Sequence, residues 1–335
     1  MTSLDKVEAA AGSAFILLAL VVQPARAAEY RAPRNEYGQP DLRGVWNFSS
    51  DVPLERAKEL ADKNYRTREE LDKANAARDT NLERLTQVAG GVGAHNSFWL
   101  DYKAHAEDLR TSLISHPANG RLPKLVDGVQ KIGGFAAALK DIPGTRPVRF
   151  YFGGIGKDGP EDRGLGERCV ASEVGPPLIP GFDNNYIQIF QGRDHVVILN
   201  EQIHDARTIP LDTRPPLDDE LRAWLGYSRG RWDADTLVVE TTNFNDLTPS
   251  FDNSGTAYHK TVTERFTRVS DTTVSYAVTL VDPKTFQDRI EFSFPMIKTD
   301  HRIHEFACHE GNYSMDMILR GARKEERDAL QTKKQ

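Results

Sequence analysis

From Tyr186 onward the sequence alternates between apolar and polar residues, with the period of two at which side chains change face along a β-strand. Short turn segments, such as residues 270–271 and 282–284, separate several of these stretches. No helical segment lies between the last five stretches, which excludes the helical crossovers of a parallel sheet. The pattern predicts a mainly β protein with added helices (α+β), whose antiparallel meander forms a barrel or a sandwich. The expected strands are residues 186–191, 195–203, 235–244, 261–269, 272–282, 288–297 and 302–308.

The part of the chain before this meander predicts helices and loops. Residues 53–88 have a polar helical pattern, and Thr67 with Glu70 has the spacing of a capping box. The apolar stripe of this helix is thin, which indicates a helix on a surface. The other expected elements are a strand near 42–49, a strand at 110–114, a helix at 124–141, a strand at 148–152 and a helix at 319–332.

These patterns divide the 335 residues into four segments. The expected segments are a signal peptide (1–27), a helical and loop region packed on the barrel (28–160), an antiparallel β domain (161–318) and a charged C-terminal helix or tail (319–335). Hydrophobic residues make up 39% of the chain, which is enough for a sizeable core. The sequence does not indicate an oligomeric state.

The N-terminus predicts an exported protein. An apolar run over residues 14–22 precedes Ala25-Arg26-Ala27, which has the small-x-small pattern of a signal-peptide cleavage site. The run is too short to span a bilayer comfortably, so we expect no stable membrane span in the mature chain. Cleavage near Ala27 then predicts a periplasmic or secreted protein.

Export gives the two cysteines, Cys169 and Cys308, a structural interpretation. An oxidising compartment favours a disulfide between them. In the chain-entropy model, a disulfide that closes a loop of that length stabilises the folded protein by roughly 5 kcal/mol. One alternative is a pair of separate buried thiols. Another is that Cys308, beside His309, is a thiolate nucleophile, which oxidation would disable.

Several functional classes lack their sequence signals. The net charge is −6 and no basic cluster is present, which argues against nucleic-acid binding. Residues 154–159 match G-x-G-x-x-G, but Pro160 and a charged loop follow instead of a helix, which favours a turn over a dinucleotide site. Neither a P-loop nor the G-x-S-x-G of a serine hydrolase is present. Metal binding through His204, His259 and His309 has no supporting spacing, so we predict no metal and no cofactor.

Two doublets, His204-Asp205 and His309-Glu310, are the predicted catalytic residues. Neighbouring residues of a strand point apart, so neither doublet forms a dyad by itself. Across strands, His204 could meet Glu310, or Asp205 could orient His309. A histidine held by a carboxylate is a common general acid or base near neutral pH. The alternative is that these side chains satisfy backbone groups at strand ends.

Other residues are candidates for substrate binding. Glu264 shares a strand face with Val262 and Phe266, and a carboxylate between two core residues needs a partner or water. It therefore suggests a polar cavity, unless it lies at a frayed strand end. Asn243 falls on the predicted core face of its strand. Tyr313 follows Gly311, whose backbone freedom lets nearby polar groups turn into a pocket.

Arginines and aromatic residues also gather around the loop that precedes the strand at 235–244. They are Arg207, Trp224, Tyr227, Arg229, Arg231 and Trp232. Such a set can clamp an anionic or ring-shaped ligand, with Arg207 and Trp232 in contact with it. The favoured alternative is a loop pinned by cation–π contacts and by ion pairs with Asp233 and Asp235.

A set of motifs resembles a family of exported bacterial proteins of uncharacterised function. The motifs are Arg110-Thr111-Ser112-Leu113-Ile114, His204-Asp205-Ala206-Arg207, Gly230-Arg231-Trp232 with the segment 235–244, Glu264-Arg265-Phe266 and Cys308-His309-Glu310-Gly311-Asn312-Tyr313. The resemblance covers most of the mature chain. It implies a bacterial origin and an exported location, and it supplies no catalytic assignment.

A separate, shorter resemblance rests on Gly44-Val45-Trp46 together with the meander. This combination is similar to the opening of lipocalin-type barrels, in which the tryptophan plugs one end. Like a lipocalin, such a barrel would enclose a small apolar ligand. The alternative is an ordinary core tryptophan.

Three functional hypotheses follow. The first is an exported enzyme that uses metal-free acid–base chemistry, as a hydrolase, lyase or isomerase, on a small organic substrate in a cavity at the barrel end. The second is a lipocalin-like binder of a small hydrophobic ligand, with an apolar interior and with Glu264 and His309 outside. The third is a structural or envelope-associated protein that uses the helix at 53–88 as an interaction surface.

Overall fold

The computed structural model describes residues 30–88, 107–129, 131, 156–171, 175–181, 183–212 and 214–333. The chain separates into two compact units, Met1–Arg31 and Ala32–Gln335. All the helices and strands described below belong to the second unit. The predicted signal peptide and the strand predicted at 148–152 lie outside the described residues.

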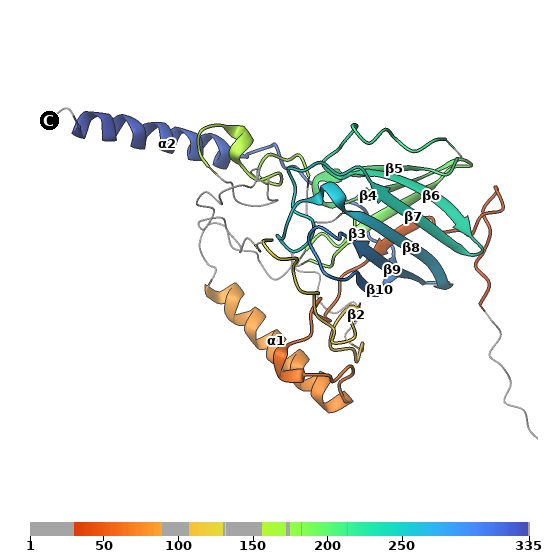
Figure 1. Ribbon diagram of the computed structural model, residues 1–335. Coiled ribbons are helices and arrows are strands. Elements are labelled where there is room, and N and C mark those ends of the chain that lie inside the picture. The colour runs from red at the N-terminus through yellow and green to blue at the C-terminus, as the bar shows by residue number, and fades with distance from the viewer. Residues whose placement is uncertain are drawn as a thin grey trace, which may run out of the picture. The chain divides into compact units, whose positions relative to one another are not determined.

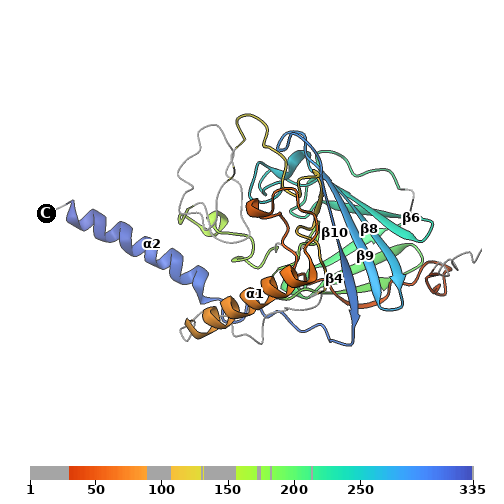
Figure 2. The same ribbon diagram turned by 90° about the horizontal axis from the view of Figure 1, so that it is seen from below.

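The second unit is built on one antiparallel sheet, which confirms the predicted α+β class and the meander. Its strands are β1 (Gly44–Asn47), β2 (Ile114–His116), β3 (Tyr186–Gln191), β4 (His195–Asn200), β5 (Ala206–Pro210), β6 (Tyr227–Asp233), β7 (Thr236–Thr242), β8 (Thr261–Ser270), β9 (Thr273–Val281) and β10 (Ile290–Thr299). Their order is β5-β4-β3-β1-β10-β9-β8-β7-β6, and β2 pairs with β10 beside this path. Figures 1 and 2 show β8, β9 and β10 running side by side.

The sheet curls until its two terminal strands, β5 and β6, lie against each other. No ladder joins them among the described residues, and side chains make the contact instead. A Cβ atom added at Gly230 of β6 would lie 2.8 Å from Leu211 and 2.9 Å from Ile209 of β5. Glycine at this position therefore allows the two strands to approach closely.

Alternating side chains of the strands fill the space inside the curl. In β8 the inward residues are Val262, Glu264 and Phe266, each 0% exposed, as the alternation predicted. Trp46 of β1 is also fully buried, and its indole nitrogen donates to the carbonyl oxygen of Leu42 at 2.8 Å. Most of the interior is aliphatic and aromatic, so polar residues such as Glu264 stand out.

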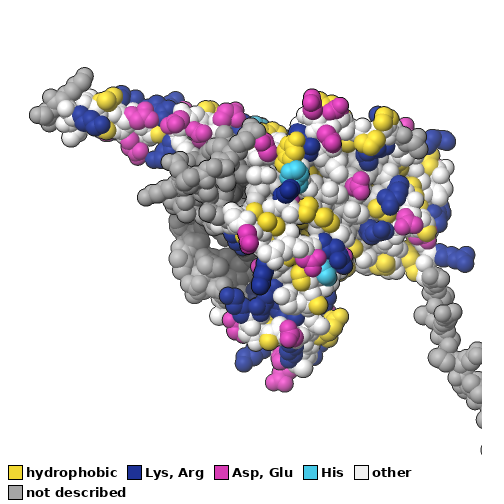
Figure 3. All heavy atoms as spheres, viewed as in Figure 1, with side chains coloured by type: hydrophobic (Ala, Val, Ile, Leu, Met, Phe, Trp, Pro, Cys, Tyr) yellow, Lys and Arg dark blue, Asp and Glu magenta, His cyan; other side chains and the backbone are white. Residues whose placement is uncertain are grey.

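Among the described residues, two α-helices accompany the sheet: α1 (Arg68–Val88) and α2 (Tyr313–Thr332). The predicted capping box of α1 is confirmed, because Glu70 N donates to Thr67 Oγ1 at 3.2 Å and Thr67 N donates to Glu70 at 2.8 Å. The charged C-terminal helix is also confirmed, and it begins six residues earlier than predicted. Acidic and basic side chains cover the visible surface of α2 in Figure 3.

The helix predicted at 53–88 is too long at its start. Residues before Thr67 form only a short 3-10 turn, η1 (Lys58–Leu60). Their backbone groups bond instead to the segment at 109–113: Arg66 N donates to Leu109 O at 2.7 Å, and Leu113 N donates to Pro53 O at 2.9 Å. These hydrogen bonds replace helical ones.

The strand predicted at 302–308 is wrong, because these residues leave the sheet without pairing. Strand β10 is flanked by β9 on one edge and by β1 and β2 on the other, so no edge remains for a further hairpin strand. The helix predicted at 124–141 is also wrong where the structure describes it, since residues 124–129 form turns and a β-bridge. The strand predicted at 110–114 is displaced and becomes β2.

The other 3-10 turns in the described part of the chain are η3 (Pro160–Asp162), η4 (Gln202–His204) and η5 (Ala257–His259). Turn η4 joins β4 to β5, so the strand predicted at 195–203 ends at Asn200. The turn before Pro160 is followed by η3 rather than by a long helix. For residues 156–159, the part of this motif that the structure describes, this agrees with the interpretation as a turn.

Candidate functional site

Arg207 of β5, Glu264 of β8 and Tyr276 of β9 form a polar network inside the sheet. Both terminal nitrogens of Arg207 donate to the Glu264 carboxylate, one of them to Oε1 at 3.0 Å. The Tyr276 hydroxyl donates to the same Oε1 at 2.8 Å and accepts a hydrogen bond from Leu178 N at 2.9 Å. Glu264 and Tyr276 are fully buried, and the Arg207 side chain is 11% exposed. The Glu264 carboxylate, the Tyr276 hydroxyl and both terminal nitrogens of Arg207 therefore have partners at this depth.

The charges in this network are mutually stabilised. Burial is the largest influence on the pKa of Arg207 and would lower it, but the charge and hydrogen bonds of Glu264 outweigh burial and raise that pKa. Burial raises the pKa of Tyr276 well above its usual range, and the charge of Glu264 adds to the effect. At neutral pH Arg207 is thus a guanidinium cation and Tyr276 a protonated phenol.

Asp205 is close enough to this network to be influenced by the charge of Arg207. Its side chain is partly buried, two residues before Arg207. Burial raises the pKa of the Asp205 carboxyl, although the charge of Arg207, a hydrogen bond from Asn200 and the charge of His204 act in the opposite direction. A raised pKa makes this carboxylate a stronger base than an exposed aspartate.

His204 stands next to Asp205 at the end of turn η4, and its side chain is exposed. The backbone of Ile203 and His204 has positive φ angles of 56° and 44°, which are rare for residues with a side chain. His204 Nδ1 lies 3.3 Å from the carbonyl oxygen of Phe306. A carbonyl oxygen only accepts, so Nδ1 is the donor in this contact, and Nε2 makes no hydrogen bond among the described residues.

The disulfide predicted between Cys169 and Cys308 is confirmed, with an S–S distance of 2.02 Å. It links the segment at 165–171 to the segment that follows β10. Phe306, whose carbonyl oxygen orients His204, lies two residues before Cys308. The disulfide therefore restrains the segment against which the imidazole is held.

Asn200, which the sequence did not single out, borders Asp205. It is 4% exposed, and its Oδ1 atom is buried without a hydrogen-bond partner among the described residues. The alternation Val196, Ile198, Asn200 along β4 contains the signal that this side chain points inward. A buried acceptor without a partner is rare, and it is a group that a bound ligand can satisfy.

The second predicted doublet lies elsewhere. His309 and Glu310 lie just before α2, and their exposed side chains make no hydrogen bond or ion pair among the described residues. The pairs expected between His204 and Glu310, and between Asp205 and His309, are therefore not formed. Tyr313, the first residue of α2, is 69% exposed.

Two other predicted binding residues, Asn243 and Trp232, have contacts that indicate a structural role. Asn243 is buried with a φ of 56°, and its side-chain nitrogen donates to Asp218 O at 2.9 Å and to Leu221 O at 3.1 Å. It anchors the loop that precedes β6. Trp232 packs on the core from β6, and its buried Nε1 lacks a partner among the described residues.

The arginine-rich loop is held by contacts that differ from those expected. Arg229 donates to the carbonyl oxygens of Asp212 and Arg214. Asp233 pairs with Arg265 at 3.5 Å, while Asp235 pairs with Arg34. The two aspartates thus form ion pairs with β8 and with the N-terminal segment rather than with the loop.

Glu201, His301 and His304 form a second cluster that sequence reasoning missed. Glu201 is 3% exposed, and its Oε1 accepts from His304 N at 2.9 Å and lies 3.2 Å from His301 Nε2. The His301 ring stacks on Tyr186 with centroids 4.0 Å apart. Because the segment after β10 was predicted to be a strand, its contacts with Tyr186 of β3 and with Glu201 could not be predicted.

Across the described part of the chain, the side chains of histidine, cysteine, aspartate and glutamate form no group of three or more that could hold a metal ion. Neither of the described α-helices is long and apolar enough to cross a bilayer. No protein-family model, no curated protein and no solved structure matches the chain.

Proposed function

We propose that the protein is an exported enzyme that performs acid–base chemistry on a small organic substrate, as a hydrolase, lyase or isomerase. The observation that carries this proposal is the arrangement of His204, Asp205 and Arg207 at one end of the sheet. A free imidazole nitrogen, a carboxyl of raised pKa and a fixed guanidinium follow one another within four residues. This combination is typical of sites that move protons.

Each residue has a role that its geometry supports. Nε2 of His204 exchanges a proton with the substrate, since Nδ1 is engaged with Phe306 O. Asp205 takes a second proton, and its raised pKa improves it as a base. The cationic Arg207 lies beside Asp205 and favours negative charge that develops on the substrate, while Glu264 and Tyr276 keep its guanidinium in place.

Two further features support a site here. Turn η4 maintains two adjacent positive φ angles, and such costly backbone conformations cluster at functional sites. The unsatisfied Oδ1 of Asn200 next to Asp205 supplies an acceptor for a substrate N–H or O–H group. The buried Arg207–Glu264 pair also places charge inside an otherwise apolar interior, which is unfavourable for a carrier of hydrophobic molecules.

Export is part of the same proposal. The Cys169–Cys308 disulfide supports it, because disulfides persist in oxidising compartments such as the periplasm. The apolar N-terminal run and the Ala25-Arg26-Ala27 pattern support a cleaved signal peptide.

The test is an activity screen on the disulfide-bonded protein. Chromogenic esters and glycosides would report hydrolysis, and proton NMR of a metabolite library in D₂O would report the C–H exchange expected of lyases and isomerases. His204→Gln and Asp205→Asn should each reduce turnover roughly 10²- to 10⁴-fold, the usual contribution of a general acid or base. Because Asp205 acts as a base, Asp205→Asn should also remove the rise in activity with pH at the acidic end of the profile.

His195 and Asp194 supply matched controls, because they form another histidine–carboxylate contact, at 2.7 Å, on the protein surface. His195→Gln and Asp194→Asn should leave turnover unchanged. His309→Ala tests the other predicted catalytic histidine. Turnover should fall in this variant only if the exposed His309-Glu310 doublet also takes part in catalysis. Activity that survives in both His204→Gln and Asp205→Asn, or its absence across the whole screen, would contradict the proposal.

A further inference from the structure

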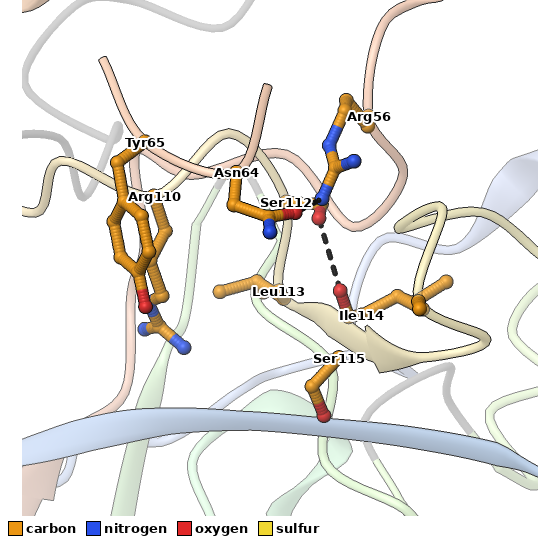
Figure 4. Close-up of a pocket in the computed structure, with 9 residues that line it drawn as sticks. Arg56, Asn64, Tyr65, Arg110, Ser112, Leu113, Ile114 and Ser115 are labelled. Carbon is orange, nitrogen blue, oxygen red and sulfur yellow. Dashed lines mark hydrogen bonds between the residues drawn. The ribbon is translucent and has the colours of Figure 1, made fainter. Parts of the chain in front are cut away.

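We infer that a pocket remote in sequence from His204 and Asp205 binds a small organic monocarboxylate, with its carboxylate on Arg56. The pocket has a volume of about 260 Å³ and lies between the segment at 56–65 and the segment at 110–118. Figure 4 shows the side chains that line it, which include Arg56, Asn64, Tyr65, Arg110, Ser112 and Ser115. This inference does not depend on the proposed enzyme.

Arg56 is a buried cation without a charged partner. Its residue is 5% exposed, and it forms no ion pair among the described residues. Its Nε donates to Thr111 Oγ1 at 2.9 Å, one terminal nitrogen donates to Asn64 Oδ1, and the other donates to Ala61 O at 3.4 Å. All three acceptors are neutral. A buried charge without a counter-charge is costly, which favours binding of an anion here.

The surroundings of Arg56 are built to hold the guanidinium in one position. Gly120 has a φ of 69°, and a Cβ atom there would lie 2.8 Å from Nη2 and 2.9 Å from Cζ of Arg56. Arg56 N donates to Gly120 O at 2.7 Å. The fully buried Thr111 hydroxyl accepts a hydrogen bond from Arg56 Nε and donates one to Lys63 O at 2.6 Å. A preorganised guanidinium loses little entropy when it binds.

The second arginine of the pocket is already neutralised. Arg110 pairs with Asp108 through Nη2 at 2.6 Å and donates through Nη1 to Ser293 O at 2.8 Å. The charge of the pocket that lacks a partner is therefore the single charge of Arg56. In Figure 4 the Tyr65 ring lies beside Arg110, and Tyr65 is 64% exposed, so its ring forms an open wall of the pocket.

This chemistry favours a carboxylate over a phosphate. A guanidinium has five N–H groups, and the three hydrogen bonds of Arg56 leave one on each terminal nitrogen. Two parallel N–H groups match the two oxygens of a carboxylate. One uncompensated positive charge balances one carboxylate, whereas a phosphate monoester carries about −1.5 to −2 at neutral pH. The remaining volume admits a small organic group against Tyr65.

The test follows amide and side-chain NMR signals of the ¹⁵N-labelled, disulfide-bonded chain during titration with sodium benzoate and sodium propionate. Sodium chloride and sodium phosphate at equal ionic strength are the comparison salts. The carboxylates should shift the Gly120, Asn64 and Ser112 signals in a saturable way, and chloride should not. Arg56→Gln should weaken carboxylate binding at least tenfold, and Tyr65→Ala should weaken binding of benzoate more than that of propionate. Arg265→Gln, which removes an exposed arginine of β8 outside the pocket, is a matched control that should change affinity less than twofold.

Arg56→Gln removes a buried side chain and can destabilise the fold. The titration of the unaltered chain and the exposed Tyr65→Ala variant therefore test the inference without relying on Arg56→Gln. No saturable shift at Gly120, Asn64 and Ser112 would overturn the inference. So would tighter binding of phosphate than of either carboxylate, or benzoate affinity unchanged in a folded Arg56→Gln protein.

Discussion

The buried pair of Arg207 and Glu264 makes a stability prediction at the level of single residues. Arg207→Met leaves the Glu264 carboxylate, which is 0% exposed, without its counter-charge. Breaking a buried pair in this way usually destabilises by about 3–5 kcal/mol. We expect a loss of that size in the free energy of unfolding, measured by urea denaturation.

Two variants separate charge burial from general disruption. Arg265→Met, on β8 next to Glu264, removes an exposed pair with Asp233 and should cost less than about 1 kcal/mol. The double variant Arg207→Met with Glu264→Leu removes both buried charges, so it should be more stable than Arg207→Met alone. A double variant less stable than the single one would show that the pair is not held mainly by its charges.

Lys260 makes a second prediction, on the pH dependence of stability. Lys260 is 6% exposed just before β8, and its Nζ lies 4.1 Å from the centroid of the Phe244 ring. Burial lowers the pKa of Lys260 from 10.5 to about 7, although the charge of Asp282 acts in the opposite direction. Asp282 is itself buried, and its Oδ2 has no hydrogen-bond partner among the described residues.

The sign of the effect follows from proton binding. Between pH 7 and pH 10.5 the unfolded chain holds a proton on Lys260 that the folded chain has released, so stability rises with pH. The slope reaches at most about 1.4 kcal/mol per pH unit. Urea denaturation from pH 7 to 9.5 should show this rise, and Lys260→Met should remove most of it. A rise of equal size in that variant would assign it to other groups.

At the level of elements, the contact between β5 and β6 depends on Gly230. A Cβ atom there would lie 2.8 Å from a Leu211 carbon and 2.9 Å from an Ile209 carbon, closer than real contacts. Gly230→Ala should therefore separate the two terminal strands and lower the free energy of unfolding by about 1–3 kcal/mol. Gly159, with no atom within 4 Å of an added Cβ, is the matched control, and Gly159→Ala should change stability by less than about 0.5 kcal/mol. Equal effects in a chemical denaturation series would mean that this contact contributes little.

The strands that the sequence predicted well are those with clear alternation. Strands β8, β9 and β10 each bury every second residue over at least eight positions, so the period of two is visible without knowledge of their partners. The same alternation placed Glu264 inside. It could also have placed Tyr276, which shares a face with Val274 and Val278.

The elements that were missed depend on partners that local pattern does not reveal. Strand β5 has no clean alternation and ends at Pro210, and β6 contains Arg229, Gly230 and Arg231, so both resemble loops. The segment at 302–308 alternates but finds no free sheet edge beside β10. The geometry of the candidate site was the hardest part to predict. The position of His204 depends on turn η4 and on Phe306, neither of which the pattern predicts.

At the level of the whole molecule, the Cys169–Cys308 disulfide joins two segments that are 139 residues apart. The chain-entropy model assigns about 5 kcal/mol to a loop of that length, and losses of a natural disulfide are typically 2–5 kcal/mol. The disulfide also restrains the segment that carries Phe306 O, the acceptor for His204 Nδ1. Its loss should therefore affect the fold and the candidate site together.

The proposed export and this disulfide make one joint prediction. Protein produced with its own N-terminus in a bacterium that exports it should begin at Ala28 and contain no free thiol, as intact mass and thiol alkylation would show. The same residues from Ala28 produced in a reducing cytoplasm should carry two free thiols and be 2–5 kcal/mol less stable in urea. Cys169→Ser with Cys308→Ser should match the reduced protein in stability under both conditions. An exported chain that keeps residues 1–27, or a double variant as stable as the oxidised protein, would contradict the view that this fold is adapted to an oxidising compartment.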